Sequence, residues 1–253
     1  MFEAIAEGVK ICHGDCLEVM REIPDGSVDM VLCDLPYGTT RNKWDSVIPF
    51  EPLWDHYKRI VKDNGAIVLF GQEPFSTELR HICLTMYRYD LIWEKTKAGG
   101  FLNAKRRPLQ AHENISVFYK RLPTYNPQMR EGKPYRKKAI TNGDGFNYGR
   151  FERSGTVQVN DGTRFPRSVI KVPNDNHGSL HPTQKPVPLL EYLIKTYTNE
   201  GETVLDNCMG SGSTGVACVN TNRNFIGIEL DDKYFDIAKE RIEHECAQGR
   251  VEI

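Results

Sequence analysis

The stretch Val28–Gly38 constrains the fold of this chain most strongly, because it reads as a buried strand that stops at a polar turn. Residues 28–33 are mostly apolar and strand-forming, and the residues that follow them are Asp34, Leu35, Pro36 and Tyr37. The proline and the glycine end the strand and restrict the turn. Ligand sites of open α/β sheets lie at the carboxyl ends of strands, so this turn is a candidate site.

The turn carries groups that suit a planar aromatic amine. Asp34 offers two carboxylate oxygens, and Pro36 biases Leu35 toward an extended conformation that holds its carbonyl outward. Tyr37 adds a flat face for stacking. An adenine N6 or cytosine N4 amino group is a poor nucleophile because its lone pair is delocalised, and two acceptors on its N–H groups return electron density to nitrogen. The alternative is a plain turn in which Asp34 only caps the next element, which is common for short motifs.

Length and composition favour one large α/β domain that carries an insertion. The chain has 253 residues, of which 39% are hydrophobic, enough for a full core. It has no apolar run of about 18 residues and no charged-then-apolar leader, so we expect a cytoplasmic protein without a membrane segment. Seven cysteines without a C-x-x-C pair argue against a disulfide framework and a zinc site, and we expect no metal.

A net charge of −1 conceals a strongly basic middle third. Between Lys95 and Lys171 there are 17 Lys and Arg residues against 5 Asp and Glu, an excess of +12. Aromatic and loop-forming residues are interleaved with these charges, which is typical of a nucleic-acid contact surface, whereas the alternative is a solvated basic loop. The candidate DNA contacts are Arg41, Lys43, Lys105, Arg106, Arg107, Arg136, Lys137 and Lys138.

The order of the expected elements indicates a doubly wound, mostly parallel sheet. Its seven expected strands are 9–12, 28–33, 66–70, 87–95, 115–119, 203–206 and 224–229, and helices are expected at 16–22, 50–61, 73–84, 187–197, 214–220 and up to Glu245. A right-handed crossover between the first two strands places Asp15 and Asp34 at the same edge of the sheet. Asp15 either binds a polar ligand there or caps the helix that follows, and its position alone does not decide.

The last quarter of the chain has the pattern of a nucleoside-binding unit. A strand ending at Asp206 runs into a glycine-rich turn, and the next strand ends at Glu229, 17 residues after Gly212. The glycines let the backbone approach a ligand, a helix start favours a carboxylate, and an acid at a strand end can accept from two ribose hydroxyls. A ligand with a ribose and an amino-acid carboxylate but no phosphate fits best, although a glycine turn taken alone is more often structural.

Together these motifs resemble those of the amino-methylating DNA methyltransferases of the β class, in which the catalytic D-P-P-Y motif precedes the target-recognition region and the S-adenosylmethionine motif comes last. Asp34-Leu35-Pro36-Tyr37 matches the catalytic motif with Leu35 in place of the first proline, and the carbonyl of that residue is retained. Asp206–Thr214 resembles D-P-F-x-G-S-G-T, with Asn207 and Cys208 in place of Pro and Phe. The resemblance covers nearly the whole chain outside the middle insertion.

The resemblance implies a class I S-adenosylmethionine-dependent methyltransferase fold with a circularly permuted motif order. It implies a catalytic half at 1–120, a target-recognition insertion at 121–176 and a cofactor-binding half at 177–253. The H-P-T-Q-K-P segment at residues 181–186 would border the methionine end of the cofactor. Glu229 would bind the ribose, and Asp15 would recognise the adenine amino group. The implied cofactor-binding residues are Asp15, Cys16, Asp34, Thr183, Lys185, Asp206, Asn207, Cys208, Gly210, Ser211, Gly212, Ser213, Thr214, Glu229 and Leu230.

The implied reaction is methyl transfer to a base flipped out of duplex DNA. Asp34 and the Leu35 carbonyl would accept from the amino group, Tyr37 would stack on the base, and nitrogen would attack the methyl group in line. An aspartate at the head of the motif favours N6-adenine in this family, and N4-cytosine is the alternative. RNA is a more distant alternative, because the basic insertion carries no recognised RNA-binding signature.

Two rival functions stay open on the sequence alone. A small-molecule or protein methyltransferase would share the nucleoside site without needing the basic segment, whereas a catalytically silent DNA-binding module would need neither motif. Members of the family are often dimers, but neither an interface, nor a partner nuclease of a restriction-modification system, nor the recognised DNA site can be read from the sequence. The resemblance implies a bacterial or phage-encoded cytoplasmic enzyme.

Overall fold

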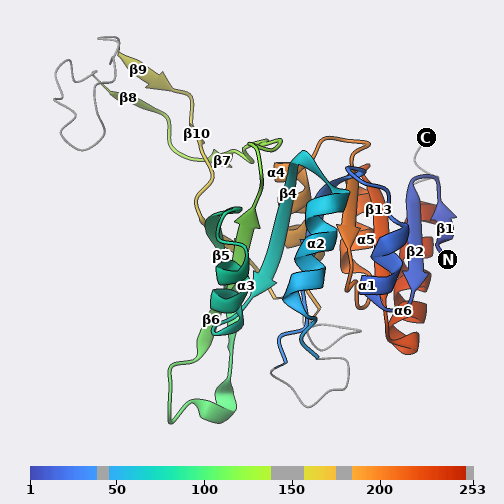
Figure 1. The fold of residues 1–253 in the computed structure, drawn as a ribbon. Coiled ribbons are helices and arrows are strands. Elements are labelled where there is room, and N and C mark those ends of the chain that lie inside the picture. The colour runs from blue at the N-terminus through green and yellow to red at the C-terminus, as the bar shows by residue number, and fades with distance from the viewer. Residues whose placement is uncertain (39–45, 138–156, 175–183, 249–253) are drawn as a thin grey trace. The chain divides into compact units, whose positions relative to one another are not determined.

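The computed structural model describes residues 1–38, 46–137, 157–174 and 184–248, and contacts divide the chain into a main unit, Met1–Asn126 with Ser168–Ile253, and a smaller unit, Pro127–Arg167 (Figure 1). The strands of the main unit are β1 (Glu3–Ala6), β2 (Val9–His13), β3 (Val28–Cys33), β4 (Val61–Gly71), β5 (Tyr87–Gly99), β6 (Gln110–Phe118), β11 (Val169–Val172), β12 (Thr203–Asp206) and β13 (Asn224–Glu229). Within the described residues they form one sheet in the order β1-β2-β13-β12-β3-β4-β6-β5-β11.

The architecture confirms the expected mostly parallel sheet. The run from β2 through β13, β12 and β3 to β4 is parallel throughout, and β6 reverses the direction between β4 and β5. All seven expected strands are present, but the sheet has nine strands among the described residues, because β1 and β11 add short strands at opposite edges. β11 lies inside the span expected as an insertion and joins the main sheet by pairing in parallel with β5.

Helices cover both faces of the sheet. On one face lie α1 (Cys16–Val19) with the 3-10 turn η1 (Met20–Glu22), α2 (Phe50–Ile60) and α3 (Phe75–Ile82), and on the other α4 (Val187–Tyr197), α5 (Ser213–Asn220) and α6 (Asp232–Gln248). Strand β3 shows the cause: Val31 and Cys33 pack with the first set, and Met30 and Leu32 pack with the second. Successive side chains of a strand point to opposite faces, so an all-apolar strand needs helices on both sides.

Strand adjacency brings the two sequence motifs together. Strands β3 and β12 are parallel neighbours, with Val204 opposite Met30 and Leu205 opposite Val31. The turn that begins at Asp34 and the turn that begins after Asp206 therefore leave the sheet side by side, although they lie far apart in the sequence. Strands β13 and β2 run in the same direction, so the residues that follow them reach the same edge.

The smaller unit contains short antiparallel strand pairs in its described part. Strand β7 (Arg130–Glu131) pairs with β10 (Thr163–Arg164), and β8 (Tyr135–Lys137) pairs with β9 (Gln158–Asn160). The unit lies inside the expected target-recognition span 121–176, while residues at both ends of that span belong to the main unit. Arg136 and Lys137 are exposed on β8, and Lys138 lies outside the described residues. DNA binding by this unit stays a prediction.

Candidate active site

A cavity of about 850 Å³ lies at the carboxyl edge of the parallel strands in the main unit. It is lined by the loops that follow β2, β3, β12 and β13, so both sequence motifs open into the same space. The predicted site residues that line it are Asp15, Cys16, Asp34, Leu35, Pro36, Tyr37, Lys185, Asp206, Asn207, Cys208, Gly210, Ser211, Ser213, Thr214, Glu229 and Leu230. A space of this size is typical of small-molecule sites in proteins.

The structure does not describe four of the candidate residues, and it places Gly212 away from the cavity wall. Thr183, Arg41, Lys43 and Lys138 lie outside the described residues. Gly212 is not among the residues that line the cavity; it is the N-cap of α5 with φ 78°, and a Cβ there would meet the backbone of Ala238 on α6 at 3.0 Å. Its glycine is therefore explained by the close approach of α5 to α6 and by a left-handed backbone.

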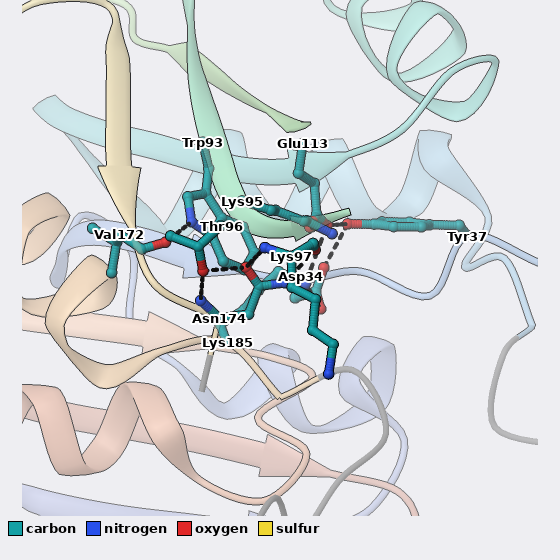
Figure 2. Close-up of polar contacts among 10 residues, drawn as sticks. All are labelled: Asp34, Tyr37, Trp93, Lys95, Thr96, Lys97, Glu113, Val172, Asn174 and Lys185. Carbon is teal, nitrogen blue, oxygen red and sulfur yellow. Dashed lines mark hydrogen bonds and ion pairs between the residues drawn. The ribbon is translucent and has the colours of Figure 1, made fainter. Parts of the chain in front are cut away.

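Asp34 belongs to a buried cluster of charged groups (Figure 2). The Tyr37 hydroxyl lies 2.6 Å from Oδ1 of Asp34 and 2.9 Å from Oε1 of Glu113. Lys185 contacts Oδ2 of Asp34, and its Nζ lies 3.2 Å from Oε1 of Glu113. Lys95 binds the other oxygen of Glu113 at 2.9 Å. Two carboxylates thus face two ammonium groups, and their charges balance.

The two groups that donate to Asp34, the Tyr37 hydroxyl and the Lys185 ammonium, can both donate to Glu113 as well. A single hydroxyl proton cannot serve two carboxylates, so Tyr37 donates to Asp34 or to Glu113 at any moment, whereas Lys185 has three protons and reaches both. Glu113 is 3% exposed and Lys185 8% exposed, so water cannot readily replace either partner. If Asp34 takes a new donor, Tyr37 and Lys185 can turn to Glu113 without leaving a buried polar group unpaired.

The surroundings shift the two carboxylates in opposite directions. Burial raises the pKa of Asp34, and the Glu113 charge adds to the rise while Lys185 opposes it. Burial works to raise the pKa of Glu113 as well, but Lys185 and Lys95 together bring it below its usual value. Glu113 therefore holds its negative charge firmly, and Asp34 is the more basic carboxylate. Burial also keeps the pKa of Tyr37 well above its usual value, so its hydroxyl stays neutral.

Glu113 and Lys95 are site residues that no sequence motif indicated. Glu113 lies on β6 and Lys95 on β5. Both line the cavity, as does Trp93, which also lies on β5. The signal that was available is the polar run His112-Glu113-Asn114, which immediately precedes the mostly apolar residues 115–118. A charged residue that is buried in a strand of the core is unusual enough to mark a site candidate.

The acids at the ends of β12 and β13 build the glycine-rich turn. Oε2 of Glu229 accepts from the Gly210 N–H at 2.8 Å. Its Oε1 accepts from the backbone N–H groups of Leu230 and Asp231, the two residues after Glu229. Asp206 accepts from the Cys208 N–H at 3.1 Å and from the Thr214 hydroxyl at 2.6 Å. A carboxylate has about four lone-pair sites, so Glu229 retains acceptor capacity toward the cavity.

Asp15 and residues 207–208 have structural partners besides their place on the cavity wall. Asp15 caps α1 by accepting from the Leu17 N–H at 2.8 Å, so the capping interpretation is confirmed, and its role toward a cofactor stays a prediction. The Tyr57 hydroxyl donates to Asn207 at 2.6 Å. Cys208 shares hydrogen bonds with the thiols of Cys16 and Cys33.

Stability should depend on pH through Asp206. Burial raises the pKa of this carboxyl from 3.8 to about 6, against opposing hydrogen bonds from Thr214 and Cys208. Between about pH 4 and pH 6 the native state then binds a proton that the unfolded chain has released, so this contribution to stability falls as the pH rises. We expect the free energy of unfolding of Asp206→Asn, measured in urea relative to that of the wild type, to rise by about 1–3 kcal/mol between pH 4 and pH 7. A wild-type-to-variant difference that does not change with pH would contradict the assignment.

The fold and the cavity define a class I S-adenosylmethionine-dependent methyltransferase domain. A family model described as DNA methylase, for the N6/N4 methyltransferases, matches residues 28–240, a span that contains both motifs of the cavity and the β5–β6 pair. The chain therefore belongs to the N6/N4 DNA methylase family, and the resemblance drawn from the motifs is confirmed.

Individual relatives agree with this family. The DNA adenine methyltransferase YhdJ of Escherichia coli (strain K12) is 26% identical over 258 residues, which cover 94% of this chain and 83% of the relative. The Type II methyltransferase M.HpaI of Haemophilus parainfluenzae is 28% identical over 251 residues, covering 93% and 74%. The crystal structure of the M1.HpyAVI–SAM complex has a TM-score of 0.63 at 26% identity, covering 91% and 98%. The cytosine-N4-specific PvuII DNA methyltransferase has a TM-score of 0.66 at 14% identity, covering 95% and 92%, a likeness of fold alone.

Proposed function

We propose that this protein transfers a methyl group from S-adenosylmethionine to the N6 amino group of adenine in double-stranded DNA. The observation that carries the proposal is the shared cavity, into which both the Asp34–Tyr37 turn and the glycine-rich turn after Asp206 open. The aspartate at the head of the catalytic motif favours adenine, and similarity to a relative named as an adenine methyltransferase supports the same choice.

The residues of the cavity fit the proposed methyl donor. Two carboxylates at the ends of the neighbouring strands β13 and β2, Glu229 and Asp15, suit the hydroxyls of a ribose and the amino group of an adenine. The turn at Gly210 lets the backbone approach the ligand, and Asp34 follows β3, which β12 separates from β13 and β2 in the sheet. When bound, S-adenosylmethionine supplies an electrophilic methyl group. Lys185, which the sequence assigns to the cofactor, has its ammonium group engaged with Asp34 and Glu113, so we propose that it acts mainly within that cluster.

The target base is held by the Asp34–Tyr37 turn in this proposal. Asp34 and the carbonyl of Leu35 accept from the two N–H groups of the exocyclic amine, which increases the electron density on its nitrogen. The ring of Tyr37 packs against that of Phe75 at a tilt of 40°, with ring centroids 4.9 Å apart, and it is proposed to stack on the base. The base must leave the duplex to reach this position.

Asp34 is also suited to take the proton that the reaction releases. After methyl transfer the nitrogen is cationic and strongly acidic, so a nearby carboxylate can accept its proton. Burial and the charge of Glu113 raise the pKa of Asp34, which makes it the better base of the pair. Lys185 and Tyr37 then turn to Glu113, which keeps its negative charge, and Asp34 holds the proton until it passes to water.

Labelled S-adenosylmethionine tests the proposed function directly. The protein is incubated with a random-sequence duplex DNA library, with RNA or with free nucleosides, and the modified base is identified after hydrolysis. We expect label in duplex DNA as N6-methyladenine, and sequencing of the methylated fraction then gives the recognition site. N4-methylcytosine instead would replace adenine by cytosine as the target. Label confined to RNA or nucleosides, or no label despite DNA binding, would contradict the proposal.

The smaller unit is proposed to contact the DNA backbone. We expect the triple charge reversal Arg136→Glu, Lys137→Glu and Lys138→Glu to weaken DNA binding and to flatten its salt dependence. Each lost phosphate contact makes the negative slope of log K against log[salt] less steep by about 0.9. Fluorescence anisotropy of a labelled duplex at several salt concentrations measures the slope. An unchanged slope, with the fold intact, would remove this unit from the DNA-binding surface.

The setting of the enzyme is part of the proposal. None of the helices in the part of the chain that the structure describes is long and apolar enough to cross a membrane. We propose a cytoplasmic enzyme of a bacterium or phage that uses no metal. A cognate restriction nuclease is proposed as a functional partner, since one relative is named as a Type II methyltransferase.

A further inference from the structure

The hairpin between β5 and β6 carries two apolar side chains at its tip. The arms of the hairpin are paired as far as Gly99 and Gln110. Beyond them the 3-10 turn η2 (Phe101–Asn103) leaves the Phe101 side chain 80% exposed and Leu102 99% exposed. Hydrogen bonds between backbone groups of residues 100–107 give the tip a defined conformation. An ordered turn that presents a phenylalanine and a leucine to solvent is a common feature of interaction sites.

The charge around this apolar pair complements a nucleic acid. From Lys97 to His112 the chain contains no acidic residue. It contains four basic residues in the same span, and those nearest the tip, Lys105, Arg106 and Arg107, are exposed. An apolar point surrounded only by positive charge suits duplex DNA, whose phosphates bind the charges while the base stack accepts the apolar groups.

The hairpin is anchored at the cavity. Trp93, Lys95 and Glu113, which line the cavity, belong to its two arms. The base of the hairpin is held by Asn174, which accepts from the Lys97 N–H at 3.3 Å and donates to the Lys97 carbonyl at 3.0 Å (Figure 2). The hairpin, drawn in green, extends past the edge of the sheet where the cavity lies (Figure 1).

The hairpin is longer than a DNA groove is deep. A strand rises about 3.3 Å per residue, so the six residue steps from Lys95 to Phe101 span at most about 20 Å. The grooves of B-DNA are about 8 Å deep. The tip can therefore reach the base pairs while the basic residues behind it stay at the level of the phosphates.

We propose that Phe101 and Leu102 enter the duplex and occupy the space that the target base leaves when it moves into the cavity. The inference rests on the proposed function, because it requires a flipped base. Flipping a base costs its stacking and pairing, and apolar side chains inserted between base steps recover part of that cost. The basic residues of the hairpin then position it on the backbone, and its apolar pair keeps the base extruded.

The test compares an intact duplex with one in which the target base is already unpaired, so that no inserted side chain is needed. Methylation rates are measured for the wild type and for Phe101→Ala/Leu102→Ala on a duplex that contains the mapped site. A second duplex has an abasic analogue opposite the target base, where pairing is already lost. We expect the double variant to be about 10- to 100-fold slower on the intact duplex and to approach the wild-type rate on the abasic one. In a duplex with 2-aminopurine at the target position, the variant should lose most of the fluorescence increase that accompanies flipping.

The control is Leu84→Ala, because Leu84 is a similarly exposed leucine, at 65%, just before the opposite end of β5. It should leave both rates and the fluorescence unchanged. A double variant equally slow on both duplexes, or as fast as the wild type on the intact one, would contradict the insertion of Phe101 and Leu102 into the duplex. A wild type that methylates neither duplex would overturn the proposed function instead, so the two failures are distinguishable.

Discussion

Replacement of Asp34 by alanine is expected to lower the rate of methyl transfer by at least about 10³-fold, while S-adenosylmethionine still binds. Asp34 is the proposed acceptor for the target amine, and without it the nitrogen lone pair stays delocalised in the ring. The residues proposed to hold the nucleoside, Glu229 and Asp15, follow other strands and keep their contacts. Single-turnover methylation measures the chemical step, and calorimetric titration measures the affinity for S-adenosylmethionine.

Asp29→Ala is a matched control for this experiment. Asp29 lies on β3, the strand that ends just before Asp34, and is paired with Lys62 at 2.6 Å and with the Thr203 N–H at 3.0 Å, so it too is a buried, ion-paired aspartate. Because it is not among the residues that line the cavity, its loss should lower the free energy of unfolding and leave the single-turnover rate nearly unchanged. Loss of S-adenosylmethionine binding by Asp34→Ala with unchanged turnover would refute the catalytic role of Asp34.

Glu113→Gln is expected to lower kcat by about 10²-fold, with KM for DNA and for S-adenosylmethionine changed by less than about threefold. Glutamine keeps the shape of the side chain but removes the charge that draws Lys185 away from Asp34. Lys185 then stays on Asp34 and occupies the oxygen that the amine needs. The added change Lys185→Met should therefore restore part of the activity, roughly tenfold over the single variant, because it frees Asp34 again.

The pH profile separates this positioning role from a structural one. The groups that act on Asp34 are Glu113, Lys185, Tyr37 and, from the end of β12, Asp206. Asp34 works as a carboxylate, so activity is lost as the pH falls through its pKa. Since the Glu113 charge raises that pKa, Glu113→Gln should move the acid limb of the kcat profile to lower pH. An unmoved limb, together with a double variant no more active than the single one, would reduce Glu113 to a structural residue.

Much of this site could be predicted because its parts are local in the sequence. The apolar run of β3 and the D-L-P-Y turn directly after it are consecutive residues, and so are β12 and its glycine-rich turn. The expected helix Val187–Tyr197 matches α4 at both ends, because Pro186 marks its start and its apolar spacing is regular. The predicted helix 73–84 is longer than the observed α3, which begins at Phe75 after Pro74 and ends at Ile82.

What the sequence by itself determined is the set of strands, the polar turns at their ends and the class of ligand those turns suit, since each depends on neighbours within a few residues. Only the tertiary structure decided which strands lie side by side. Strand β6 enters antiparallel between β4 and β5, and this pairing brings Glu113 and Lys95 to Asp34 and Lys185. The physical reason is that a buried charge is stable only beside its partners, and these partners come from four segments of the chain that no local pattern connects.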